Sequence, residues 1–155
     1  MVKFFIVFFA FIKANSWFPD DLNNKIGSDH KMISTKPVYA KIGNDFVRSV
    51  NADGFENPEG MYFVVEEWNL KIENSIKHLK EYNSIYNNAT EVFAKSIKVN
   101  KREGYIQELS LKDYKHVVFQ ILISDSEQTY LIETGCPESK KDELIKIIKT
   151  IAVEE

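Results

Sequence analysis

The sequence predicts an α+β fold, in which an antiparallel β-sheet packs against two helices. Two observations favour this class: four apolar segments in the carboxyl-terminal half are separated only by short polar turns, and two amphipathic helical patterns flank them. Connections this short require antiparallel neighbours, because a parallel return needs a dozen or more residues. The length of 155 residues and the hydrophobic content of 44% fit one domain with a single core.

The amino terminus has the pattern of a short signal peptide. Lys3 precedes an unbroken apolar run at residues 4–12, and Lys13 and a small-residue pattern follow it, which predicts cleavage between Ser16 and Trp17. The run is much shorter than the roughly 20 residues that cross a bilayer, so we expect no permanent membrane anchor. These features favour export to the periplasm or out of the cell. The alternative is a cytoplasmic protein in which this run forms a buried strand.

We expect three parts along the chain: a signal peptide at residues 1–16, an irregular lead-in at 17–41 and a single domain at 42–155. Without the two lysines of the first part, the formal net charge changes from −3 to −5. A mildly acidic protein does not favour nucleic acid as a partner, because phosphate binding requires a concentrated basic surface. The single cysteine allows no internal disulfide, so the core must provide the stability.

The first elements of the domain are two strands and a helix. Residues 45–50 and 61–65 are rich in β-branched and aromatic residues, which predicts strands, and residues 51–55 have the composition of a turn. Apolar residues then recur at helical spacing over 70–86, with charged residues on the opposite side. This pattern predicts a helix, for which Asn69 is the expected cap.

A four-stranded meander follows, with strands expected at residues 92–99, 104–111, 115–124 and 128–134. The third strand contains HVVFQILIS, which is apolar on both faces. A strand of this kind is central in its sheet and is covered on both sides.

The chain is expected to close with an amphipathic helix that covers one face of the sheet. Ser139 and Asp142 form a capping-box pattern at its start. The helix at 70–86 is the expected cover of the other face, unless both helices lie on one face. The apolar stripe of the closing helix consists of Leu144, Ile147, Ile148 and Ile151.

This order of elements resembles the PsbP-like superfamily, which includes the bacterial DcrB-like domains. The resemblance lies in FVRSVNADGFE, in the helix IENSIKHLKEY and in the long stretch from KREGYIQELSL to the end of KKDELIKIIKTI, and it covers about residues 42–152. Ala52 stands where the family usually has proline. The resemblance implies a PsbP-like α/β sandwich and no enzymatic activity.

The resemblance also implies how such a protein acts. Exported members of the superfamily are accessory or binding proteins, as PsbP is in the oxygen-evolving complex of photosystem II. We therefore expect a protein partner and no enzymatic role. The alternative is a DcrB-like chaperone or an immunity protein linked to a bacterial secretion system. The oligomeric state stays open.

Cys136 is the sharpest candidate for reaction chemistry. A thiol between a strand and a helix amino terminus can have a lowered pKa and act as a nucleophile, which would make the protein a small hydrolase. However, Pro137 removes one of the amide donors, and neither His nor Asn stands at a cysteine-protease spacing. We interpret Cys136 as a small residue at a strand-to-helix bend, so the sequence predicts no catalytic residue.

Metal and cofactor sites are not expected. His30, His78 and His116 occur singly, without the spacing of zinc ligands. The acidic pairs Asp20-Asp21 and Glu66-Glu67 are typical of solvated turns. No glycine-rich phosphate loop or dinucleotide fingerprint is present, so the sequence predicts no cofactor.

Three aromatic residues are the candidate binding residues. Trp68 precedes the helix at 70–86, and Tyr82 and Tyr86 stand near its end. Exposed Trp and Tyr side chains are enriched at the energetic centres of protein interfaces. The sequence therefore predicts a protein-binding patch at Trp68, Tyr82 and Tyr86.

Overall fold

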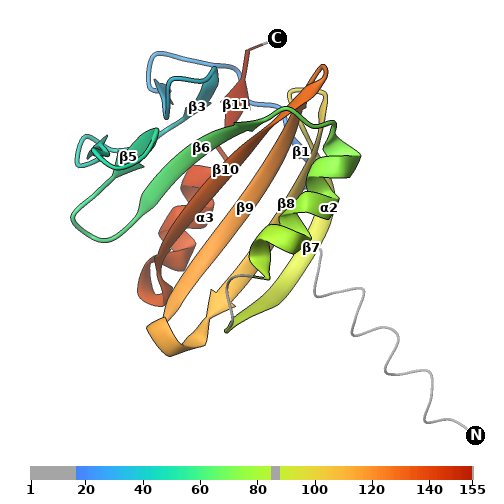
Figure 1. Cartoon of the computed structure of the whole chain (residues 1–155). Helices are drawn as coiled ribbons and strands as arrows, with labels where there is room; N and C mark the ends of the chain where they lie inside the picture. The colour runs from blue at the N-terminus through green and yellow to red at the C-terminus, as the bar shows by residue number, and fades with distance from the viewer. Residues whose placement is uncertain (1–16, 85–87, 155) are drawn as a thin grey trace, which may run out of the picture.

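The structure, a computed structural model, describes residues 17–84 and 88–154. These residues form a large sheet with strand order β1-β7-β8-β9-β10-β6-β5-β4 and a small sheet with order β11-β3-β2 (Figure 1). The large sheet consists of β1 (Asp21–Leu22), β4 (Val47–Arg48), β5 (Gly54–Glu56), β6 (Tyr62–Trp68), β7 (Ala89–Val99), β8 (Arg102–Leu111), β9 (His116–Asp125) and β10 (Gln128–Pro137). The remaining elements are β2 (Lys31–Met32), β3 (Val38–Ala40), β11 (Ala152–Val153), the helices α2 (Ile72–Asn83) and α3 (Lys141–Ile148), and the 3₁₀ turns η1 (Lys112–Tyr114) and η2 (Glu138–Lys140).

Strands β7 to β10 form the predicted meander, and all three of its pairings are antiparallel. Strand β9 lies at its centre, where Ile121 is in register with Ile106 of β8 and with Ile132 of β10. The meander is continued by β6, which pairs antiparallel with the outer side of β10. The α+β class with a large antiparallel sheet and two helices is thus confirmed.

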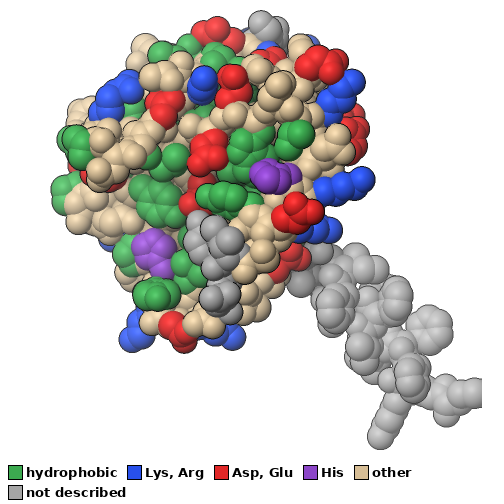
Figure 2. Space-filling model, viewed as in Figure 1, with side chains coloured by type: hydrophobic (Ala, Val, Ile, Leu, Met, Phe, Trp, Pro, Cys, Tyr) green, Lys and Arg blue, Asp and Glu red, His purple; other side chains and the backbone are tan. Residues whose placement is uncertain are grey.

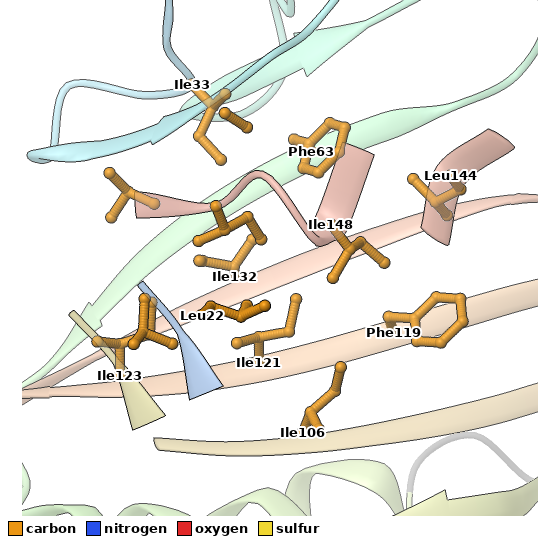
Figure 3. Close-up of a cluster of buried hydrophobic side chains, with 14 of the residues drawn as sticks. Leu22, Ile33, Phe63, Ile106, Phe119, Ile121, Ile123, Ile132, Leu144 and Ile148 are labelled. Carbon is orange, nitrogen blue, oxygen red and sulfur yellow. The ribbon is translucent and has the colours of Figure 1, made fainter. Parts of the chain in front are cut away.

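The two helices lie on opposite faces of the large sheet (Figure 1). On one face, Leu144 of α3 belongs to the same buried cluster as Ile121 of β9. On the other face, Leu79 of α2 packs in a smaller cluster with Leu122 of the same strand. The prediction that this strand is covered on both sides is confirmed. The larger cluster includes Ile33, Phe63, Ile106, Phe119, Ile123, Ile132 and Ile148 (Figure 3).

The segment 17–41 is part of the core and not an irregular lead-in. Phe18 and Leu22 are buried in the larger cluster, and Ile33, Val38 and Ala40 are not exposed at all. The backbone of the segment also joins the sheet, because β1 pairs in parallel with the end of β7. Among the described residues, the packed core therefore extends back to Phe18, well before the expected start of the domain at residue 42.

Two further expectations about the strands are wrong in detail. The expected strand at 45–50 is reduced to the two residues of β4, and the expected turn at 51–55 ends in strand β5. Gly54 permits this strand to lie close to β6, because a Cβ atom there would stand 1.7 Å from the carbonyl oxygen of Phe63. Gly54 therefore allows β5 and β6 to pair closely.

The two predicted helix caps are also wrong. Helix α2 starts after Lys71 and α3 starts after Lys140, and neither start has a side-chain cap hydrogen bond. Ser139 lies inside η2, which takes the place of the expected first turn of the closing helix. Helix α2 ends at Asn83, before the predicted end at residue 86.

We predict that α3 is required for stability because its apolar stripe covers the larger core. Leu144→Ala removes a fully buried side chain and should reduce the free energy of unfolding by about 2–5 kcal/mol, measured by urea denaturation. Lys146→Ala, on the exposed side of the same helix, should change it by less than about 0.5 kcal/mol. Equal effects of the two substitutions would contradict this role for α3.

Candidate functional site

The chain turns from β6 into α2 in a way that brings Trp68 and Tyr82 together. Trp68 ends β6 and Tyr82 lies in the last turn of α2, and their ring centroids are 6.1 Å apart. The ring of His78 meets the Trp68 ring edge-on at 4.8 Å. Trp68 and Tyr82 are half-buried and His78 is exposed. The third predicted binding residue, Tyr86, lies outside the described residues.

The aromatic pair is fixed by its surroundings. The indole N–H of Trp68 donates a hydrogen bond to Oε2 of Glu66 at 3.1 Å. Both rings pack against the small cluster beneath α2, which includes Leu79 and Leu131. Each ring thus has one side in the core and presents another part to solvent, as interface aromatics commonly do. The molecular face that carries α2 shows hydrophobic side chains between acidic and basic ones (Figure 2).

A groove of about 510 Å³ lies along the opposite flank of α2. Ile72, Glu73 and Ile76 of the helix form one wall, and Asp20 and Asp21 at β1 contribute to the lining from the sheet edge. Sequence reasoning missed this groove and placed the two aspartates in a solvated turn. Its walls come from segments about fifty residues apart, and no local pattern indicates that they meet.

Cys136 is fully buried and lies within β10, opposite Val117 of β9. The expected bend therefore does not fall at the cysteine, because β10 continues to Pro137 and η2 follows. Burial raises the pKa of the thiol to about 11, although Lys141 acts in the opposite direction. A nucleophilic cysteine requires a lowered pKa and access to substrate, so the position supports the structural interpretation of this residue.

The three histidines occupy separate structural positions. Nδ1 of His30 accepts a hydrogen bond from the backbone N–H of Gly27, and its Nε2 lies 3.1 Å from the carbonyl oxygen of Thr150. His116 stacks on Tyr62 with ring centroids 6.4 Å apart, and burial lowers its pKa. Within residues 17–84 and 88–154, no group of three or more His, Cys, Asp and Glu side chains is arranged to hold a metal ion.

A buried polar chain crosses the sheet on the side of α2. Nε2 of Gln107 donates to Oε1 of Gln120 at 2.6 Å, and Nε2 of Gln120 donates to Oε2 of Glu133 at 2.9 Å. The two glutamines are almost completely buried, so these hydrogen bonds offset the cost of removing the amides from water. The chain ties β8, β9 and β10 together, and it accounts for the polar residue in the middle of HVVFQILIS.

On the opposite face, Glu108 forms an ion pair with Lys141 at the start of α3. The Glu108 side chain is 2% exposed, and the ammonium group of Lys141 also lies 5.9 Å from the centroid of the Trp17 ring. The pair connects α3 to β8 beneath the first described residue.

None of the helices in the described part of the chain combines the length and apolar character needed to cross a bilayer.

No family model matches the sequence, and no curated protein matches it. Among solved structures, the chain is similar to the solution structure of cyanobacterial PsbP (CyanoP) from Synechocystis sp. PCC 6803, with a TM-score of 0.56. The match has 11% sequence identity and covers 84% of this chain and 98% of that chain. The similarity confirms the PsbP-like fold that the sequence pattern predicts, and the DcrB-like relationship stays a prediction.

We predict that the Cys136 thiol is inert in the folded protein. Its burial and its raised pKa together should slow labelling by Ellman's reagent at neutral pH, by on the order of a thousandfold or more relative to the urea-unfolded chain. The absorbance of the released thiolate measures the rate, and Cys136→Ala provides the blank. Rapid labelling in native buffer would contradict the structural role and favour a reactive cysteine.

Proposed function

We propose that this chain is a non-enzymatic accessory protein that binds another protein through the aromatic pair Trp68 and Tyr82. The observation that carries the proposal is their placement side by side, half-exposed, at the junction of β6 and α2. The PsbP-like fold supports an accessory role, and the burial of Cys136 removes the main candidate for catalysis.

The local geometry favours binding because the two rings are held in place before a partner arrives. Packing against the cluster under α2 restricts both side chains, and the bond from Trp68 to Glu66 restricts the indole further. Ordering a mobile side chain on binding costs about 0.5–1.5 kcal/mol, and a preorganised ring avoids much of that cost. Large, rigid aromatics of this kind commonly provide the energetic centre of an interface.

We also propose that the protein is exported after cleavage before Trp17. The packing at the start of the described chain supports this, since Trp17 lies edge-on against Phe93 at 4.9 Å and Phe18 is buried. Cleavage at the predicted point would leave every one of these contacts in the mature protein.

The aromatic site is tested by photocrosslinking in the native cell. A benzophenone amino acid at position 68 or 82 should form a crosslink to one defined protein, identified by mass spectrometry, because both positions would contact the partner directly. Tyr114 serves as the matched control, since its side chain is also aromatic, is 77% exposed and belongs to η1 rather than to β6 or α2. The same substitution at position 114 should yield no such product.

Affinity measurements with the identified partner complete this test. Trp68→Ala and Tyr82→Ala should each weaken binding by about tenfold or more, while Tyr114→Ala leaves it unchanged. Crosslinks of equal yield from all three positions, or none from position 68 or 82, would refute the proposed site.

The proposal of export is tested by the native amino terminus and by truncation. Mass spectrometry of the native protein should find a mature chain that begins at Trp17. A chain of residues 17–155 should have the same melting temperature as the full chain, because the core contacts described here begin at Trp17 and Phe18. An intact Met1 together with a large loss of stability on truncation would instead favour the cytoplasmic alternative, in which residues 1–16 belong to the fold.

A further inference from the structure

We propose that the groove beside α2 binds a basic, apolar peptide segment of a partner protein. This inference goes beyond the proposed function, since the groove lies on the opposite flank of the helix from Trp68 and Tyr82 and its test does not depend on them. Three properties of the groove favour such a peptide: its apolar wall, its unpaired carboxylates and the distribution of these charges over separate elements.

The apolar wall exists because the sheet does not fill the space beside the helix. Ile72 and Ile76 stand one helical turn apart and line the groove together. The groove floor comes from β7 and β8, where Ser96 offers only a small side chain and Lys98 and Glu103 are long, exposed ones. A hollow of about 510 Å³ with an apolar wall remains, which is in the size range of ligand-binding sites.

The charges around this hollow are mostly negative and mostly unpaired. Asp21, Glu73 and Glu103 have no side-chain ion-pair or hydrogen-bond partner among residues 17–84 and 88–154. Asp20 pairs with Lys95, which lies outside the groove lining, at 2.6 Å. Among the described residues that line the groove, Lys98 is the one lysine or arginine. Carboxylates beside an apolar wall repel one another and raise the local concentration of cations, so a basic partner gains both steering and affinity.

The placement of these carboxylates favours a peptide over a small cation. Glu73 belongs to α2, Asp21 to β1 and Glu103 to β8, so the negative groups come from three elements around the groove. A single ammonium group can neutralise only its nearest neighbour. A segment that carries several Lys or Arg side chains around an apolar ridge can satisfy the carboxylates and place aliphatic side chains against Ile72 and Ile76, as amphipathic helices do in apolar grooves.

The experiment uses the full chain and a fluorescein-labelled synthetic amphipathic helix of leucine and lysine. Fluorescence anisotropy should show saturable binding. Two altered peptides should each bind at least about tenfold more weakly. Glutamate in place of lysine removes the charge complementarity, and serine in place of leucine removes the apolar contact. Equal binding by either altered peptide would overturn the proposal.

Variants of the protein test whether the peptide binds in the groove. Ser96→Phe fills the hollow without a change of charge, and Glu73→Gln with Glu103→Gln removes exposed charge without a change of shape. Each should weaken binding by about five- to tenfold, and Glu138→Gln, an exposed carboxylate outside the groove lining, should leave it unchanged. The glutamine double variant carries the test if Ser96→Phe fails to fold, as judged by circular dichroism.

Three results would overturn the proposal. The first is peptide affinity equal to that of the unmodified chain in both groove variants. The second is groove-dependent binding of spermine without binding of the peptide, which would assign the groove to small polyamines. The third is a dimer in sedimentation analysis that Ser96→Phe dissociates, which would assign the groove to a second copy of this chain.

Discussion

The burial of β9 on both faces is the constraint on which the rest of the structure depends. All residues from Val117 to Ile123 are buried, and the strand lies between β8 and β10 with a helix on each side of the sheet. An antiparallel strand that faced water on one side would alternate apolar and polar residues. Because this strand does not, both helices are needed to keep it from solvent, and the large sheet cannot be stable as a single exposed layer.

The two faces are covered unequally, and the candidate binding surfaces follow from that difference. Helix α3, the small sheet and the segment 17–41 all contribute to the larger cluster. On the other face, α2 covers parts of β8, β9 and β10, and among the described residues its cluster has four buried apolar residues, two from the helix and two from the strands. One flank of the helix therefore presents Trp68 and Tyr82, and the other leaves the groove that Ile72 and Ile76 line.

The meander and its central strand could be predicted from the sequence because the information is local. Each turn is too short for a parallel return, and HVVFQILIS shows by itself that both faces are buried. The packing of 17–41 could not be predicted, since Phe18, Leu22 and Ile33 are isolated apolar residues whose partners lie far along the chain. The prediction of the helix caps failed because it relied on residue type alone. Ser139 has a side chain suited to capping, but it lies within η2. The pairing of Trp68 with Tyr82 followed from their nearness to one helix, whereas the groove depends on the tertiary arrangement of α2, β1 and β8.

Hydrogen exchange of the native protein, followed residue by residue by NMR, tests this account most directly. Amides of β9 should exchange only through global unfolding and should be the slowest in the chain, since the strand is buried on both sides. Amides of α2 should exchange through a local opening of lower free energy, because the helix is held by the smaller cluster. Exchange in β9 as fast as in the short edge strand β4, or slower exchange in α2 than in β9, would contradict the central position of this strand and the unequal cover of its two faces.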